Sequence, residues 1–150
     1  MKYVAVLFLL ISSLGFSQSS DEVAVKFTID RFFSAFHAQD SVEIKKTVSN
    51  HVIMQTITAD KAGKSMVKTE DFSKFLKNIV AIPKEKKFEE KLLSYHIQVD
   101  GNLASVWTPY QFWFGDIYSH CGANSFQLFK ENNAWKIIYI IDTRRKEGCQ

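Results

Sequence analysis

The side chains best suited to chemistry in this chain lie in its last third, around His120 and Asp142. Imidazole titrates near neutral pH, so His120 is the candidate for proton transfer, with a structural, hydrogen-bonded histidine as the alternative. Asp142 and Arg144 are expected to form a structural ion pair; alternatively, the planar guanidinium of Arg144 suits an anionic ligand. Neighbouring strand residues point to opposite faces, so Cys121 is not expected to act as a nucleophile with His120.

The remaining histidines and glycines indicate no further catalytic chemistry. The four histidines are separated from one another and lack close carboxylate or cysteine partners, so no metal site is expected. No glycine-rich phosphate loop occurs, and no cofactor is expected. His51 and Gln55 share one face of an expected strand and are candidates to line a pocket, with a surface or core role as the alternative. His37 and His96 are expected to be peripheral.

Two cysteines, Cys121 and Cys149, are present. An even count in an exported chain predicts a disulfide, and two free thiols are the alternative. Gly148 tolerates the positive backbone angles of a chain reversal, which would bring Cys149 back beside Cys121. Closing a loop of this size adds about 3 kcal/mol of stability in the chain-entropy model.

The first 17 residues have the pattern of a secretory signal peptide. Lys2 precedes a short apolar run that ends near Phe16, and the run is too short for the roughly 20 residues that span a bilayer. Small residues near its end place the cleavage between Ser17 and Gln18, and a buried strand or uncleaved anchor is the alternative. Residues 18–150 then form one exported domain, periplasmic or secreted, with no membrane association after cleavage.

The charge balance argues against a nucleic-acid partner. The chain has 19 basic and 16 acidic residues, and its formal net charge is +3. Acidic and basic residues alternate along the chain and form no basic patch, which indicates a solvated surface.

The first half of the chain predicts helices around one strand pair. Apolar residues recur at helical spacing over residues 21–38, and a second helix is expected from Asp40 to Val48. Residues 51–58 are rich in β-branched side chains and predict a strand, with a short partner near Met66. A third helix is expected between Thr69 and Pro83.

The second half predicts an antiparallel meander. Four strands separated by turn residues are expected over residues 92–99, 102–114, 117–130 and 135–143. Helices that precede and interrupt an antiparallel sheet indicate an α+β fold, with the helices packed on one face.

The two-residue turns at 115–116 and 132–133 predict a strand register. They place Gln111 opposite His120, and Asn124 opposite Ile141, unless a bulge shifts the pairs. One face then combines apolar and polar groups in the manner of a small-molecule pocket. Together with the first strand, it supplies these candidate ligand-binding residues: His51, Gln55, Trp107, Gln111, His120, Asn124 and Tyr139. The opposite face, with Asp142 and Arg144, is expected to form a homodimer surface through the sheet.

Several segments resemble the nuclear transport factor 2-like (NTF2-like, or SnoaL-like) superfamily. The resemblance covers about residues 21–145. Three features carry it: Phe32-Phe33-Ser34-Ala35-Phe36, Asp40 and Trp135-Lys136-Ile137-Ile138. Four further segments match one branch of the superfamily: Trp107-Thr108-Pro109-Tyr110, Ser119-His120-Cys121-Gly122, Ser125-Phe126-Gln127-Leu128 and Asp142-Thr143-Arg144-Arg145. It implies a cone of helices and a curved sheet with a pocket at the wide end. The most similar branch is a group of small exported bacterial proteins labelled lumazine-binding.

Three functional hypotheses follow, because this fold supports enzymes, binders and scaffolds. The first is a protein that binds a flat, partly polar heterocycle or aromatic compound, similar to lumazine. The second is an enzyme of the SnoaL or ketosteroid isomerase type that uses His120 as acid or base with Asp142 or Tyr110. The third is a structural or interaction module that dimerises through its sheet.

Overall fold

The computed structural model describes residues 20–149. The predicted signal peptide, residues 1–17, lies outside this range. Three helices and seven strands follow in this order: α1 (Ser20–His37), α2 (Ser41–Thr47), β1 (Val48–Ala59), β2 (Ser65–Glu70), α3 (Phe72–Val80), β3 (Phe88–Leu92), β4 (His96–Asp100), β5 (Leu103–Phe114), β6 (Ile117–Glu131) and β7 (Ala134–Thr143). None of the helices in the described residues is both long and apolar enough to cross a bilayer.

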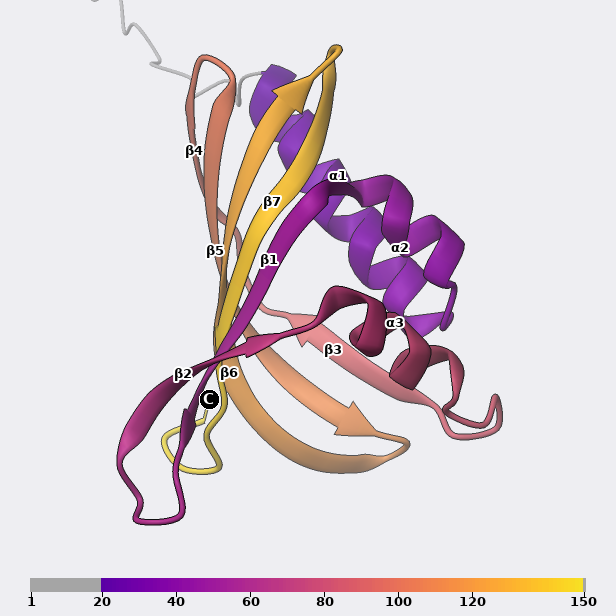
Figure 1. Ribbon diagram of the computed structural model, residues 1–150, viewed down its shortest axis with the longest axis vertical. Coiled ribbons are helices and arrows are strands. Elements are labelled where there is room, and N and C mark those ends of the chain that lie inside the picture. Colours follow the sequence, from indigo (N-terminus) through magenta and orange to yellow (C-terminus); the bar gives the residue numbers. More distant parts are fainter. Residues whose placement is uncertain (1–19, 150) are drawn as a thin grey trace, which may run out of the picture.

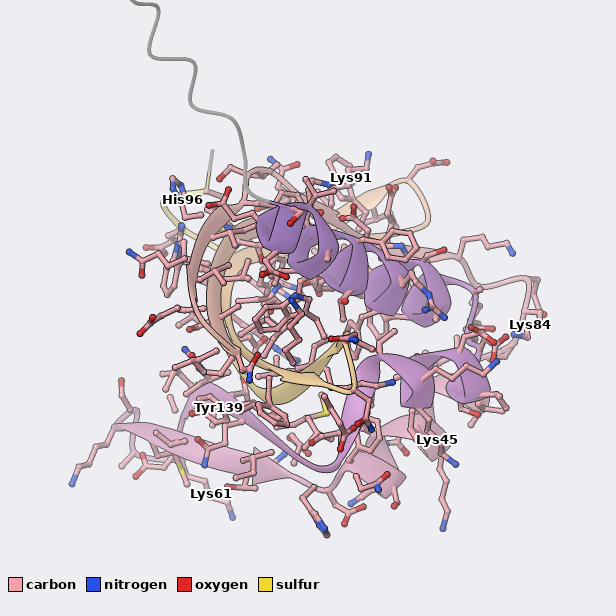
Figure 2. The ribbon with its side chains drawn as sticks, turned by 90° about the horizontal axis from the view of Figure 1, so that it is seen from above. Lys45, Lys61, Lys84, Lys91, His96 and Tyr139 are labelled. Carbon is pink, nitrogen blue, oxygen red and sulfur yellow. A yellow bond between two sulfur atoms is a disulfide. The ribbon has the colours of Figure 1, made fainter. Side chains whose placement is uncertain are left out.

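The sheet is curved, and its concave face is covered by helices (Figures 1 and 2). The strand order is β2-β1-β7-β6-β5-β3, and β4 also pairs with β5. Only the β1–β7 pair is parallel; the other pairs are antiparallel. The predicted α+β class, with helices packed on a curved and mostly antiparallel sheet, is therefore confirmed.

Helix α1 packs on the sheet through one phenylalanine-rich face. Val25, Ile29, Phe32 and Phe33 are buried at helical spacing. The rings of Phe32 and Phe33 meet Phe126 of β6 at centroid distances of 6.5 and 6.1 Å, both edge-on. The aromatic rings therefore set the separation between the helix and the concave face of the sheet.

Polar contacts hold α1 at both its beginning and its middle. Asp21 accepts hydrogen bonds from Lys130 at 2.6 Å and Trp135 at 3.3 Å, which ties the first turn to the β6–β7 hairpin. Asp30 accepts a hydrogen bond from the Tyr95 hydroxyl at 2.5 Å, next to β4. The helix is thereby fixed against strands that follow it by more than 60 residues.

Two bulges make the predicted strand register wrong by one residue. Ser119 is an extra residue in β6, so His120 pairs with Phe112 rather than Gln111. Ile138 is an extra residue in β7, so residues nearer the chain end shift and Asn124 pairs with Asp142. Beyond each inserted residue, the side chains of the strand point to the opposite face of the sheet from the one predicted. Asp142 therefore shares the concave face with Asn124.

One predicted strand, residues 92–99, is in fact two. Strands β3 and β4 both pair with β5 but leave residues 93–95 between them. The gap lies opposite Pro109, which has no N–H to donate on this side of β5, although its carbonyl accepts from Leu93 at 2.8 Å. The third helix also starts later than predicted, because Asp71 rather than Thr69 is its N-cap.

The predicted disulfide between Cys121 and Cys149 is confirmed. The two Cα atoms are 5.8 Å apart, within the range that a disulfide requires. Gly148 has φ of 62°, which fits the chain reversal that glycine permits. Between the two cysteines, Arg145 forms a backbone bridge with Cys121, so the tail folds back over β6.

The disulfide gives a prediction of stability. It closes a loop with a sequence separation of 28 residues, so its loss is expected to lower the free energy of unfolding by about 3–4 kcal/mol. Urea denaturation of the oxidised protein, the Cys149→Ser variant and the reduced wild type would measure this effect. The last two are expected to unfold at the same urea concentration; equal stability of all three proteins would contradict the prediction.

Candidate functional site

A cavity of about 240 Å³ lies between the concave face of the sheet and the helices. One part of its wall is aromatic, because five phenylalanines from α1, α3 and β6 line it: Phe32, Phe33, Phe36, Phe75 and Phe126. The other part is polar and includes Glu90, Asn124, Asp142 and Arg144. An apolar wall with a few convergent polar groups is the usual composition of a small-molecule site.

Glu90 is the central polar group of this cavity. It lies on β3, and strand alternation points it to the same face as the buried Phe88. Asn124 donates a hydrogen bond from Nδ2 to Glu90 Oε1 at 2.7 Å. The backbone N–H of Glu90 donates to His37 Nε2 at 2.9 Å, so α1 and β6 both hold this residue in place.

The surroundings of Glu90 favour its neutral form. Burial raises the pKa of the Glu90 carboxyl to about 7, and the negative charge of Asp142 adds to this increase. The hydrogen bond from Asn124 and the charge of Arg144 oppose it but are smaller effects. A carboxyl group that changes charge near neutral pH within a cavity is a frequent feature of functional sites.

The Asp142–Arg144 pair forms the neighbouring part of the polar wall. Arg144 Nε donates to Asp142 Oδ2 at 2.9 Å. The Asp142 side chain is 14% exposed and that of Arg144 is 62% exposed, so the cation lies on the solvent side of the pair. Much of the positive charge of Arg144 is therefore already engaged by Asp142.

Tyr110 crosses beneath this cluster because Gly122 leaves room for it. The Tyr110 hydroxyl donates to the carbonyl oxygen of Thr143 at 2.9 Å and lies 3.4 Å from Asp142 Oδ2. A Cβ atom at Gly122 would come within 2.7 Å of the Tyr110 ring and 1.8 Å of the Thr143 carbonyl oxygen. Burial, with the charges of Glu90 and Asp142, raises the pKa of Tyr110, so its hydroxyl stays protonated.

One buried polar group in the cavity wall lacks a protein partner. Thr56 is 7% exposed and lines the cavity from β1. Its hydroxyl makes no hydrogen bond with any described residue. A buried hydroxyl without a partner costs about 1–3 kcal/mol. The position therefore favours a bound molecule that supplies a donor or an acceptor.

Four of the residues singled out in the sequence line this cavity. Asn124 is there as a candidate ligand-binding residue. Gln55 is part of the wall on β1, while its side chain bonds to Tyr139 and Thr69 on the convex face. Asp142 and Arg144, assigned in the sequence to the opposite face, are there as well, because the two bulges change the register.

The other candidates lie elsewhere. His120 is on the concave face but does not line the cavity; its ring stacks on Phe112 with a centroid distance of 4.9 Å. Burial lowers the pKa of His120, and the positive charges of Arg144 and Lys146 lower it further. The rest of the set lines no part of this cavity: His51, Trp107, Gln111 and Tyr139.

The convex face of the sheet holds Tyr139 and Trp107. Tyr139 donates from its hydroxyl to Gln55 Oε1 at 2.6 Å, and Gln55 donates to Thr69, so β7, β1 and β2 are linked on this side. Trp107 is 49% exposed. Pairing through the sheet stays a prediction. The face assigned to it in the sequence, with Asp142 and Arg144, is the concave one, whereas large apolar side chains are exposed on the convex face: Ile53, Val67, Leu103 and Phe129.

Sequence reasoning missed two residues of the site. Glu90 lies in a charged stretch, residues 84–91, that predicts a loop passing into a strand; the alternation of Phe88, Glu90 and Leu92 could have placed it on the inner face. His37, expected to be peripheral, is partly buried and accepts the Glu90 N–H. Burial lowers the pKa of His37, which favours the neutral ring that this hydrogen bond requires.

Within residues 20–149, no group of three or more His, Cys, Asp and Glu side chains is arranged to hold a metal ion.

The curved sheet, the helices on its concave face and the cavity between them define an NTF2-like fold. An NTF2-like protein of unknown function from Shewanella baltica OS155 matches 87% of this chain and 100% of its own, with a TM-score of 0.63 and 13% identity. Another, from Pseudomonas putida KT2440, matches 82% of this chain and 85% of its own, with a TM-score of 0.68 and 11% identity.

A protein of unknown function with a cystatin-like fold, from Nostoc punctiforme PCC 73102, is also similar. It matches 87% of this chain and 95% of its own, with a TM-score of 0.67 and 12% identity. No family model matches the chain, and no curated protein matches it. At these identities the similarity shows the fold, and the function has to be argued from the site.

The pKa of Glu90 gives a prediction of pH dependence. Its value rises from the ordinary 4.5 to about 7 on folding, so the folded protein binds this proton more tightly than the unfolded chain. The stabilising contribution is complete below pH 4.5 and is lost as the pH rises through 7. The loss amounts to about 3 kcal/mol.

Urea denaturation between pH 4.5 and 8 would measure this contribution as the difference between wild type and Glu90→Gln. The glutamine at position 90 in the variant cannot titrate. The free energy of unfolding of the wild type is therefore expected to fall relative to that of the variant as the pH rises. Glu89→Gln is the matched control, because Glu89 is the exposed neighbour on the same strand. His37 and His120 are present in both the wild type and Glu90→Gln, so their contributions cancel in that difference; the charge of Glu89 raises the pKa of His37, so only the control changes it. A difference that does not change with pH would refute the prediction.

Proposed function

We propose that this protein binds a small, flat, partly polar aromatic or heterocyclic molecule in the cavity between α1, α3 and the sheet. The observation that carries the proposal is the cavity itself, with five phenylalanines on one side and Glu90, Asn124 and Asp142 on the other. Its volume of about 240 Å³ is below the 300–1,000 Å³ or so of drug-sized sites, which suits a molecule of one or two rings. A lumazine-like pteridine is one such molecule.

Export is part of the same proposal. The first 17 residues have the pattern of a signal peptide. The Cys121–Cys149 disulfide is of the kind that persists in oxidising compartments. The binding protein would accordingly act in the periplasm or outside the cell.

Closing the mouth of the cavity is expected to abolish binding. Asn78 lines the cavity from α3 and is exposed, so Asn78→Trp adds bulk at the mouth without disturbing the core. Thermal-shift and calorimetric titration with a panel of lumazine and other one- and two-ring heteroaromatics would identify binders. For each of them, Asn78→Trp is expected to weaken binding at least tenfold, equivalent to about 1.4 kcal/mol.

Lys77→Trp provides the control, because Lys77 is the exposed neighbour on α3 and does not line the cavity. It is expected to bind the same compounds as the wild type does. No binder in the panel, or binders that Asn78→Trp does not affect, would refute the proposed function.

An enzyme is the second candidate function, with Glu90 rather than His120 as the acid or base. A proton-transfer group works best when its pKa lies near the working pH, and the pKa of Glu90 is about 7. Tyr110 remains protonated close by, and the wall around the cluster is aromatic. The arrangement suits the removal or delivery of a proton on a small apolar substrate.

Hydrogen–deuterium exchange of enolisable cyclic ketones in D₂O, followed by NMR, would test the enzyme hypothesis. General-base catalysis contributes about 10²–10⁴-fold, so the wild type is expected to accelerate exchange and Glu90→Gln to lose this acceleration. Glu89→Gln is expected to behave as the wild type. Exchange at the rate of the buffer alone in all three proteins would argue against a proton-transfer enzyme.

A further inference from the structure

The charged side chains of the cavity wall are not balanced. Among the described residues, three acidic ones line it, Glu70, Glu90 and Asp142, against one basic residue, Arg144. Asp142 is paired with Arg144 at 2.9 Å, and Glu70 with Lys68 at 2.5 Å. Within residues 20–149, Glu90 makes no ion pair of this kind. Its carboxylate is therefore the charge that a ligand would have to balance.

This balance argues against an anionic ligand. A carboxylate or phosphate would have to compete with Asp142 for Arg144, whose side chain lies on the solvent side of that pair. It would also lie close to Glu90, where two negative charges in a poorly hydrated site repel one another. Arg144 is therefore not expected to bind an anionic ligand, because it already pairs with Asp142 and the carboxyl group of Glu90 lies nearby.

The neutral parts of the wall favour a ring that carries N–H donors. Five phenylalanine rings line the cavity, and aromatic rings attract an organic cation. The Thr56 hydroxyl, 7% exposed and without a partner among the described residues, can accept a hydrogen bond from such a ligand. The unpartnered Thr56 hydroxyl is a second observation, separate from the charges of the acidic residues, that indicates a bound molecule.

We propose that the cavity selects a flat organic cation: an aromatic ring with a protonated nitrogen group, such as an amidinium, a guanidinium or a protonated amino-heterocycle. Its charged edge would lie on Glu90 and its ring among the phenylalanines. This inference rests on the proposed binding function and narrows its ligand class.

The geometry also sets the pH dependence of binding. The charged and titratable groups around Glu90 come from five elements, with Arg144 directly after the last of them: His37 (α1), Glu70 (β2), Tyr110 (β5), His120 (β6) and Asp142 (β7). Both histidines have a pKa below the ordinary 6.5 and stay neutral above that pH. With the pKa of Glu90 at about 7, raising the pH from 6.5 to 8.5 increases its ionised fraction, and so the affinity for a cation, about fourfold.

Three probes of one shape and different charge would test this inference: benzamidine, benzamide and benzoate. Calorimetric titration of the full chain at pH 8 is expected to give binding of benzamidinium at least tenfold tighter than that of the neutral or anionic probe. Glu90→Gln is expected to remove this preference, whereas Glu89→Gln is expected to keep it. Circular dichroism would verify the fold of each variant. The fourfold increase in affinity for benzamidinium between pH 6.5 and 8.5 is measured on the wild type alone.

Tighter binding of benzamide or benzoate, a preference that survives in Glu90→Gln, or affinity for benzamidinium that does not rise with pH would overturn the inference. Failure of all three probes would also overturn it. If a neutral or anionic heteroaromatic then binds and Asn78→Trp blocks it, the binding function stands and only the cationic class is wrong. If no compound of either panel binds, both proposals fail.

Discussion

The packing of the α1 phenylalanines on Phe126 is the interaction on which the rest of this structure depends. Phe32 and Phe33 meet Phe126 edge-on, and Phe36 continues the cluster to Phe75 of α3 and Phe88 of β3. Aromatic rings bury a large area and favour edge-on contacts, so this cluster holds the helices against the sheet. The curved sheet closes around them, and the space that remains beside the rings is the cavity.

The polar side of the cavity depends on contacts between strands that are distant in sequence. Glu90 is held by Asn124 and by His37, and Asp142 is held by Arg144. None of these groups would be stable alone in a largely apolar site, because burying a charge without partners is costly. The cluster therefore combines a paired charge with a carboxyl group that burial keeps partly neutral near pH 7.

The end of the chain supports this cluster. Arg144 follows β7 directly, and the next residue bridges to Cys121 through two backbone hydrogen bonds. The disulfide to Cys149 then closes the tail against the same part of β6. Gly122, between Cys121 and the cavity residue Asn124, lets Tyr110 reach the Thr143 carbonyl. Covalent and hydrogen-bonded links thus fix the segment that carries Asp142 and Arg144.

Local patterns in the sequence determined the elements and the disulfide chemistry of this protein. The spacing of apolar residues in α1 and the runs of β-branched residues in β1 act within a few residues, so the sequence alone predicts them. Which residues meet in the cavity was decided only by the tertiary structure. Single inserted residues, Ser119 and Ile138, change which face a side chain takes, and no local signal reveals them. Glu90 becomes a functional candidate for the same reason: Asn124 and His37, which hold it in place, are 34 and 53 residues away in the sequence. Its burial in the fold is what raises its pKa.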